Sequence, residues 1–352
     1  MTFHTFELSY RISMVRYFKV CETIREKYSS KFFPDRANTG RWIFTGLEGA
    51  GIIICFSKHT IYDEYSEVKV FYRINPVRLL HSGDYLNLFH SNDVGDLFDL
   101  IDERLSEVAN ILPKVREGTL VRFDFCSNIV MENPSRVKDW IYLLNRAFIP
   151  AGKYKQKKVF NKRAGRYELP DNEATFTRDE LVEVSFYDKI EQLCSERLPV
   201  SWDETILRCE VRCYYRAIKI LRQKFSLDSL EDFFLSIVEV GNYVFTQRLR
   251  ELGFAYSFYC LDDMRKMITT SPFKNKTKKA LLFFATAAAK HKGIENAIIG
   301  ELMTGAGKYT KKLGIMNISA MPLPVRSSIE SGTNILDLCL RFADAKKVDR
   351  LS

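Results

Sequence analysis

The sequence predicts an α+β protein, in which an antiparallel sheet with flanking helices precedes a helical C-terminal region. Short β-branched and aromatic segments alternate with amphipathic helices over the first 225 residues, and the pattern then becomes helical. The chain has 352 residues, of which 13% are aromatic, enough for two or three domains with their own cores. We therefore expect an α+β core over residues 1–225 and a helical region over 226–352.

Six segments of the first part have the composition of strands and are bounded by turn residues. They are residues 41–45, 51–56, 68–72, 120–126, 181–188 and 205–214. Helical spacing of apolar residues predicts two helices, one over 93–112, which stops at Pro113, and one over 135–148. The basic stretch 149–166 contains two glycines and is expected to be a loop or an irregular hairpin.

Helical periodicity dominates the second part of the chain. The expected helices span 229–242, 246–252, 261–270, 278–291, 294–303 and about 307–313. Ser229-Leu-Glu-Asp232 resembles a capping box at the start of the first of them. No segment of 20–50 residues repeats itself, so a solenoid is excluded.

Positive charge is concentrated in two places. The chain carries a net charge of +9, and the window 264–312 alone holds eleven Lys/Arg against Glu295 and Glu301. A second run, 153–166, holds seven Lys/Arg and no acid. Clustered cations of this kind neutralise nucleic-acid phosphates, although two solvated faces are the simpler alternative and a membrane surface is a weaker one. The expected DNA-binding residues in these runs are Lys155, Lys157, Lys158, Lys274, Lys276, Lys278, Lys279, Lys308, Lys311 and Lys312.

Nothing in the sequence predicts export or membrane insertion. The longest apolar stretches, 49–56 and 280–289, are about half the ~20 residues needed to cross a bilayer. The first residues lack the basic start and apolar centre of a secretory signal. The eight cysteines are scattered, so we expect reduced thiols and a cytoplasmic protein.

Side-chain alternation on three of the predicted strands gathers polar residues on one face. The apolar rows are Val121, Phe123 and Phe125; Val182, Val184 and Phe186; and Leu207, Cys209, Val211 and Cys213. The opposite rows are Arg122 and Asp124; Glu183, Ser185, Tyr187 and Lys189; and Arg208, Glu210 and Arg212.

Such a face has the groups needed for phosphoryl chemistry. Asp124 and Glu210 would offer oxygen ligands to Mg²⁺ or Mn²⁺. Tyr187 would be the nucleophile, with Lys189 stabilising the phenolate or the developing phosphate charge, because a phenol with a pKa of ~10 needs such help. Arg122, Arg208 and Arg212 would contact DNA. The alternative is an ordinary antiparallel sheet with one solvated face.

The ordered motifs resemble the replication initiator encoded by gene II of filamentous bacteriophages, the phage/plasmid replication protein II/X family. The blocks run in the same order over most of residues 40 to 330. They include Glu67-Val-Lys69, Asn75-Pro-Val-Arg-Leu-Leu-His-Ser-Gly83, Asn87-Leu-Phe89, Val121-Arg-Phe-Asp124, Phe186-Tyr-Asp-Lys-Ile-Glu191, Ile206-Leu-Arg-Cys-Glu-Val-Arg212, Thr270-Ser-Pro-Phe-Lys-Asn-Lys276, Met316-Asn-Ile-Ser319 and Pro322-Leu-Pro-Val325.

The resemblance implies a relaxase-like core that nicks one strand at a rolling-circle origin and holds the 5′ phosphate on a tyrosine. Tyr187 falls on the tyrosine of the family's Tyr-x-Lys pattern, Asp124 on its Arg-x-Asp strand and Glu210 on its Arg-x-Glu strand. The implied partners are double-stranded origin DNA, the displaced single strand, and the host helicase and polymerase in the bacterial cytoplasm; an oligomer on the DNA is compatible with this, and no membrane is involved. The His-x-His metal motif of common relaxases is missing, which fits a carboxylate-only metal site, and Glu67 or Glu183 would be the third ligand.

The sequence pattern over about 278–314 predicts three short helices. A helix-turn-helix would place Lys308, Tyr309, Lys311 and Lys312 on a recognition helix at the major groove, and a helical packing subdomain with a solvated lysine face is the alternative. Gly305-Ala-Gly307-Lys308 lacks the spacing of a phosphate-binding loop, so no nucleotide site is expected. At the level of function, the alternative to a nickase is a non-catalytic origin-binding protein or transcriptional regulator that recruits host replication enzymes.

Overall fold

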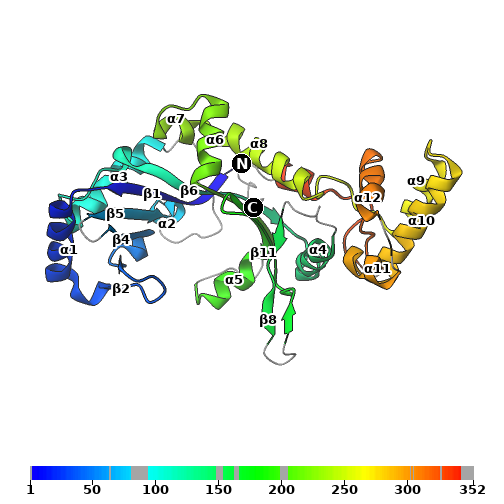
Figure 1. The fold of residues 1–352 in the computed structure, drawn as a ribbon, viewed down its shortest axis with the longest axis horizontal. Coiled ribbons are helices and arrows are strands. Elements are labelled where there is room, and N and C mark those ends of the chain that lie inside the picture. Colours follow the sequence, from blue (N-terminus) through cyan, green and yellow to red (C-terminus); the bar gives the residue numbers. More distant parts are fainter. Residues whose placement is uncertain are drawn as a thin grey trace, which may run out of the picture. The chain divides into compact units, whose positions relative to one another are not determined.

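A computed structural model shows an α+β fold with a large antiparallel sheet (Figure 1). It describes residues 2–62, 65–80, 94–147, 154–161, 166–198, 205–301, 303, 305–325 and 327–341. The chain divides into two compact units, each built from two segments. The first unit is Met1–Cys126 with Arg212–Gly241, and the second is Ser127–Val211 with Asn242–Ser352.

In the first unit the sheet has the strand order β2-β3-β4-β5-β1-β6. The strands are β1 (Thr2–Arg11), β2 (Phe32–Pro34), β3 (Arg41–Phe44), β4 (Ile52–Tyr62), β5 (Tyr65–Ile74) and β6 (Thr119–Val130), the last of which continues into the second unit. The helices are α1 (Met14–Tyr28), α2 (Pro76–Leu80), α3 (Val94–Val108), α6 (Tyr215–Phe225) and α7 (Leu230–Leu235).

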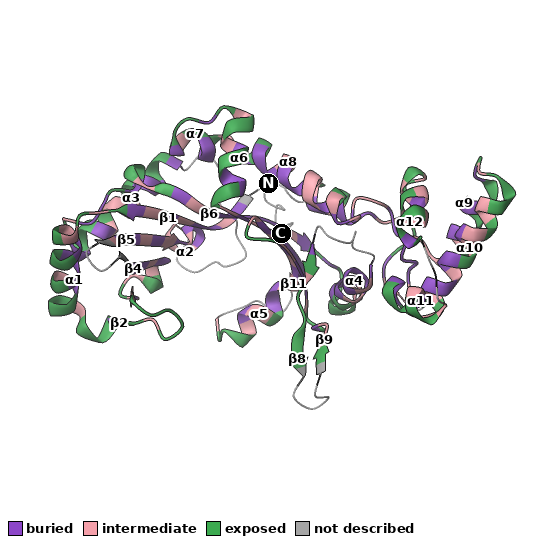
Figure 2. Ribbon diagram, viewed as in Figure 1, coloured by how far each residue is buried: buried purple, intermediate pink, exposed green. Residues whose placement is uncertain are grey.

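An aromatic core fixes one face of this sheet. Phe234 of α7 packs against Phe3 and Phe6 of β1 at ring-centroid distances of 5.2 and 4.9 Å, and against Phe98 of α3 at 5.1 Å. Phe123 of β6 lies 5.5 Å from the same ring. Because side chains alternate along a strand, burying this row turns the intervening polar residues of β1 to the opposite face (Figure 2).

In the second unit the order is β6-β12-β11-β10-β7. The strands are β7 (Lys155–Gln156), β10 (Glu173–Arg178), β11 (Val182–Asp188) and β12 (Ile206–Tyr214), and β8 (Val159–Asn161) pairs with β9 (Arg166–Glu168) in a separate ribbon. Helix α4 (Pro134–Arg146) contacts β10 and β11, and the short helix α5 (Lys189–Ser195) follows β11 directly.

The C-terminal part of the second unit is helical. It holds α9 (Leu261–Thr270), α10 (Asn275–Lys290), α11 (Ile294–Gly300), α12 (Ala306–Ile315) and α13 (Ile335–Arg341), and α8 (Ile237–Glu251) leads into it. Helix α10 contacts α9, α11 and α12, so these four form one cluster (Figure 1). The predicted change of character after Phe225 is therefore confirmed at the level of secondary structure, while the functional boundary at that residue stays a prediction.

Most predicted elements are present, with shifted ends. The strands expected over 51–56 and 68–72 extend to eleven and ten residues as β4 and β5. The boundary between the helices expected over 229–242 and 246–252 was predicted at the wrong place. Helix α7 ends before Ser236, and α8 then runs unbroken to Glu251. Eight of the strands and α-helices that the structure describes were missed: β1, β2, β10, α1, α2, α5, α6 and α13. Much of the expected loop at 149–166 lies outside the described residues.

All eight cysteines fall within the described ranges and are free thiols, as expected. Cys209 and Cys213 are fully buried in β12, which confirms their prediction as small core residues. Only Cys194 and Cys260 are part-exposed. In the ranges that the structure describes, no helix is both long and apolar enough to cross a bilayer.

Candidate active site

Tyr187 stands near the end of β11, on a row of polar side chains. In the pairing of β11 with β10, Tyr187 faces Glu173, Ser185 faces Thr175 and Glu183 faces Thr177. The hydroxyls of Thr175 and Ser185 are 3.1 Å apart, at hydrogen-bonding distance. The intervening residues of β11, including Val184 and Phe186, are buried, so the predicted alternation of this strand is confirmed.

The Tyr187 hydroxyl donates a hydrogen bond to Glu210 Oε2 at 2.9 Å. Glu210 lies on the neighbouring strand β12 and is only 6% exposed, whereas Tyr187 is part-exposed. A carboxylate in hydrogen-bond contact with a phenol can accept its proton when the oxygen attacks an electrophile. The two residues that the sequence assigned to nucleophile and metal ligand are thus in direct contact.

Lys189 does not continue the polar row of Tyr187. The strand ends at Asp188, whose carboxylate caps α5 by accepting from the backbone N–H groups of Ile190 and Glu191. Lys189 is the first residue of that helix, is 2% exposed, and donates to Gln192 Oε1 at 2.9 Å. Its predicted position on the strand was therefore wrong, because the cap at Asp188, one residue after Tyr187, ends the strand before Lys189. Its role in catalysis stays a prediction.

Arg208 was expected on an open face and is instead fully buried. Its Nε donates to Asn128 Oδ1 at 2.7 Å, and both residues belong to the second unit. The whole of β12 from Ile206 to Val211 is buried, as is usual for a central strand, so alternation there does not separate core from solvent. Contact with DNA through Arg208 stays a prediction that this burial does not favour.

Asp124 lies in the first unit, where it forms a cluster with two arginines. Its carboxylate, which is 1% exposed, receives a bidentate contact from Arg122, through Nε at 2.9 Å and through Nη2. Arg212 Nε lies 3.3 Å from both carboxylate oxygens. Two guanidinium groups on one buried carboxylate satisfy its charge, so a metal ion at Asp124 would compete with these contacts.

A β-bulge corrects the prediction for Val121. In the pairing of β6 with β1, Glu7 faces Arg122 and Leu8 faces Leu120, so Val121 has no partner. Phe123 and Phe125 are buried as predicted, but Val121 is part-exposed and lines a hollow in the first unit. The extra residue shifts the alternation by one position, which a regular two-residue period cannot anticipate.

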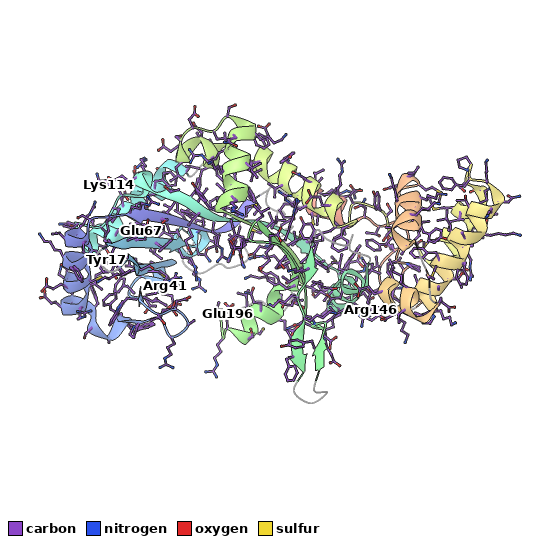
Figure 3. All side chains as sticks on the ribbon, viewed as in Figure 1. Tyr17, Arg41, Glu67, Lys114, Arg146 and Glu196 are labelled. Atoms are coloured by element: carbon purple, nitrogen blue, oxygen red, sulfur yellow. The ribbon has the colours of Figure 1, made fainter. Side chains whose placement is uncertain are left out.

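The donor chemistry suits Mg²⁺, but the described ranges hold no group of three His, Cys, Asp or Glu side chains placed to bind a metal ion. Glu67, expected as a possible third ligand, lies on β5 of the first unit (Figure 3). Its carboxylate oxygens lie 2.9 Å from Arg11 Nε and from Lys69 Nζ, so it is engaged in ion pairs. Glu183 lies on β11 opposite Thr177. Mg²⁺ or Mn²⁺ and its ligands Asp124 and Glu210 stay predictions.

The basic residues before β10 are exposed. Lys155, Lys157 and Lys158 all reach solvent, and Lys157 forms an ion pair with Glu173 at 2.7 Å. Since Glu173 faces Tyr187 across the two strands, this lysine belongs to the surroundings of the tyrosine. Glu173 was missed because β10 was not predicted, although the polar-apolar alternation of Glu173-Ala-Thr-Phe-Thr-Arg178 was a usable signal.

The lysines of the tail that were predicted to bind DNA differ in their exposure and in their contacts. Most are exposed on α10, on α12 or next to them, namely Lys274, Lys276, Lys279, Lys308 and Lys311. Lys278 Nζ instead donates to the carbonyl oxygen of Thr269 at 2.7 Å, and Lys312 Nζ lies 5.7 Å from the centre of the Phe273 ring. The three expected short helices exist as α10, α11 and α12, and recognition of a major groove by α12 stays a prediction.

Comparisons with known proteins do not name a family for this chain. No family model and no curated protein matches it. Among solved structures, it has a likeness to the crystal structure of the di-domain ARO/CYC BexL from the BE-7585A biosynthetic pathway. That match has 10% sequence identity and a TM-score of 0.22, and covers 71% of this chain and 96% of the other.

Proposed function

We propose that this protein is a rolling-circle replication initiator, which cuts one DNA strand at an origin and later rejoins the displaced strand. The hydrogen bond between the Tyr187 hydroxyl and Glu210 carries the proposal, because it pairs a part-exposed nucleophile with a buried proton acceptor. The ordered resemblance to the gene II initiators supports the choice of DNA as the substrate.

In the first step, the Tyr187 oxygen attacks the scissile phosphorus while its proton passes to Glu210. The bond from phosphorus to the 3′ oxygen breaks, and this oxygen leaves as a 3′-OH after it takes up a proton. The 5′ phosphate stays on Tyr187 as a phosphodiester. In the second step, a 3′-OH attacks this linkage, restores a DNA phosphodiester and returns the proton to the phenolate. The number of phosphodiester bonds is conserved, so no external energy source is needed.

The deciding experiment is a denaturing gel of the protein incubated with Mg²⁺ and a supercoiled plasmid that bears the cognate origin. The wild type should convert the plasmid to open circles and form a covalent adduct. Tyr187→Phe should bind DNA yet form no adduct, since it lacks only the nucleophilic oxygen. Glu210→Gln should lower the rate of adduct formation about 10²–10⁴-fold, the usual contribution of a general base. A full-strength adduct with Tyr187→Phe would disprove the assignment.

The metal requirement is tested separately for each carboxylate. A divalent cation would supply charge neutralisation at the scissile phosphate. We expect cleavage to stop in EDTA and to return with Mg²⁺ or Mn²⁺. Asp124→Asn or Glu210→Gln should raise the Mg²⁺ concentration needed for half-maximal cleavage if that carboxylate is a ligand, and an unchanged requirement would remove the residue from the metal site.

The second candidate function is origin binding without catalysis, with host replication enzymes recruited to the DNA. The exposed lysines of α10 and α12 favour it, because they are independent of Tyr187. Binding of the plasmid without relaxation, in the presence of Mg²⁺, would support this candidate over the nickase.

A further inference from the structure

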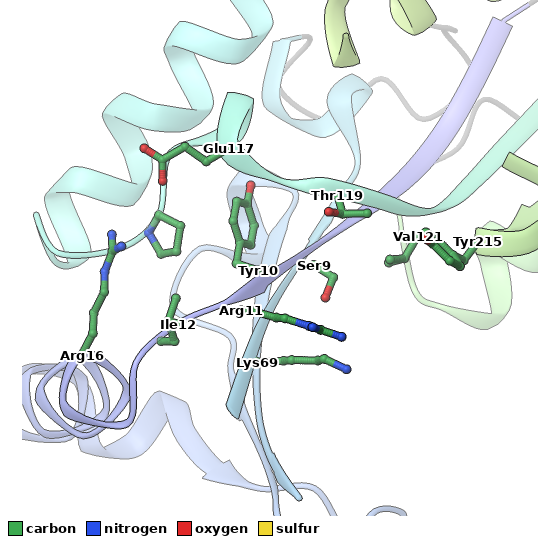
Figure 4. Close-up of a pocket in the computed structure, with 11 residues that line it drawn as sticks. Ser9, Tyr10, Arg11, Ile12, Arg16, Lys69, Glu117, Thr119, Val121 and Tyr215 are labelled. Carbon is green, nitrogen blue, oxygen red and sulfur yellow. The ribbon is translucent and has the colours of Figure 1, made fainter. Parts of the chain in front are cut away.

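The first unit has a hollow in two adjoining parts beside strands β1 and β6. One part, of about 700 Å³, lies against β1, β5 and β6 and is lined by residues that include Ser9, Arg11 and Lys69 (Figure 4). A second part, of about 510 Å³, lies against α6. Thr119 and Tyr215 line both parts, so the two adjoin at these residues.

Cations line the hollow along its length. Arg11 and Lys69 face each other across β1 and β5 (Figure 4). They share the single carboxylate of Glu67. Arg16 donates to the carbonyl oxygen of Ile111 at 2.7 Å, and Arg222 donates to that of Leu227 at 3.0 Å. Carbonyl oxygens are neutral, so these bonds orient the guanidinium groups and leave their charge in place. The remaining charged lining residues are Lys219, Glu117 and Asp228, so cations outnumber acids.

Tyr215 lies where the two parts meet. It is the first residue of α6 and is 50% exposed, although it is a large aromatic side chain beside a polar hollow. Figure 4 shows it beside Val121, the bulged residue of β6. An exposed ring in this position offers a flat apolar surface on which an unpaired base can stack, whereas the bases of a duplex are already stacked on one another.

We infer that this hollow binds the backbone of a single DNA strand, with one base stacked on Tyr215. Cations along a groove with an exposed aromatic ring between them match a polyanion whose repeating units carry flat rings. The choice of DNA rests on the proposed function, while the stacking and the phosphate contacts rest on the hollow alone.

The test measures the affinity for a fluorescent oligo(dT) of about 12 nucleotides by anisotropy, in EDTA so that no cleavage takes place. Tyr215→Ala should weaken binding about tenfold, since one stacked base is lost, and Tyr215→Phe should bind as the wild type does. Phe33→Ala, which removes a 43% exposed ring on β2 outside the hollow, should have no effect and is the matched control.

The charge contacts are tested by salt dependence. Arg11→Gln and Lys219→Gln lie in different parts of the hollow, and each should lower the slope of log affinity against log salt by about 0.7, the value for one lost contact with single-stranded DNA. Lys27→Gln, on the exposed surface of α1, should leave the slope unchanged.

Wild-type affinity in Tyr215→Ala, or unchanged slopes in both charge variants, would overturn the inference. So would equal weakening of oligo(dT) and duplex DNA by Tyr215→Ala, because stacking requires an unpaired base. These outcomes are separate from the covalent adduct at Tyr187. If the adduct forms while the hollow variants bind normally, the inference fails and the proposed function stands. If the hollow variants bind weakly and no adduct forms, the proposed nickase activity fails and the inference about the hollow stands.

Discussion

At the scale of single residues, Asp124 shows how a side chain chosen for its chemistry can also be structural. Its carboxylate is 1% exposed and holds both Arg122 and Arg212. Loss of the carboxylate would leave two adjacent guanidinium groups without their shared counter-charge. The side chains of Arg122 and Arg212 are 19% and 25% exposed, so water screens their repulsion and lowers the free-energy cost of removing the carboxylate.

We expect Asp124→Ala to lower the free energy of unfolding by about 2–3 kcal/mol. Chemical denaturation followed by circular dichroism would measure this. The control is Glu103→Ala on the exposed surface of α3, which should change stability by less than about 0.5 kcal/mol. Equal stability of Asp124→Ala and the wild type would show that the cluster contributes nothing to the fold. Any loss of cleavage by this variant must therefore be corrected for its folded fraction.

A part-buried carboxylate, Glu251, makes stability depend on pH. Burial alone would raise its pKa, but Arg248, the Tyr154 hydroxyl and Arg178 favour the charged form and lower the pKa below 4.5. Their donor atoms lie 2.9, 2.9 and 3.0 Å from Glu251 Oε2. A lowered folded pKa gives stability that is present above the unfolded value and is lost as pH falls through the folded value.

Glu251→Gln should therefore destabilise the protein by about 1–2 kcal/mol at pH 7, and by progressively less below pH ~4.5. Urea denaturation of the wild type and the variant at several pH values would give the two curves. A stability difference that stays constant from neutral to acid pH would contradict the ion-pair explanation.

At the scale of residues, side-chain alternation correctly predicted the covered face of β11. The contact between Tyr187 and Glu210 joins two residues that alternation had placed on one face. Alternation failed for Arg208, because its central strand β12 is covered on both faces. It failed for Lys189, because β11 ends one residue earlier. A two-residue period does not show whether a strand is central in its sheet, or at which residue it ends.

At the scale of elements, the start of α7 was predictable from local chemistry. The Ser229 hydroxyl accepts from the N–H of Asp232, and the Asp232 carboxylate accepts from the N–H of Ser229, both at 2.9 Å. This confirms the predicted capping box. The position of β10, which was missed, is fixed by pairing on both sides, with β11 and β7.

Ser229→Ala should cost about 1 kcal/mol of stability, because one N-terminal N–H of α7 loses its acceptor, and Ser229→Thr should restore most of it. The reason to test this helix is that it carries Phe233 and Phe234, which pack on β1 and β6. Thermal unfolding would measure the change. An unaltered melting temperature in Ser229→Ala would mean that the aromatic contacts alone hold the helix in place.

At the scale of the whole molecule, the charge excess and the proposed chemistry occupy different residues. The window 264–312 accounts for the net charge of +9, whereas Tyr187 and Glu210 lie on strands with a balanced composition. If the exposed lysines of α12 hold DNA, Lys308→Ala with Lys311→Ala should weaken binding of duplex DNA uniformly across sequences and lower its salt slope by about 2.

Titration of duplex DNA at ~50 to ~200 mM salt would test this expectation, with Lys19→Ala and Lys27→Ala on the exposed surface of α1 as the matched pair. Identical slopes for the α12 variant and the wild type would leave these lysines as a solvated helix face. The sequence could predict the α+β class and the helical tail, but not the two-segment build of each unit, since contacts between distant parts of the chain determine it.

The distribution of the cysteines has a practical consequence. Six of the eight thiols are buried, and of the two part-exposed ones Cys260 contacts Asp263, whereas Cys194 lies on α5, seven positions after Tyr187. A Cys260→Ser background would therefore carry one readily labelled sulfur. A fluorophore attached there would lie on the helix that begins directly after the strand of Tyr187, and its emission would respond to changes in the surroundings of that residue.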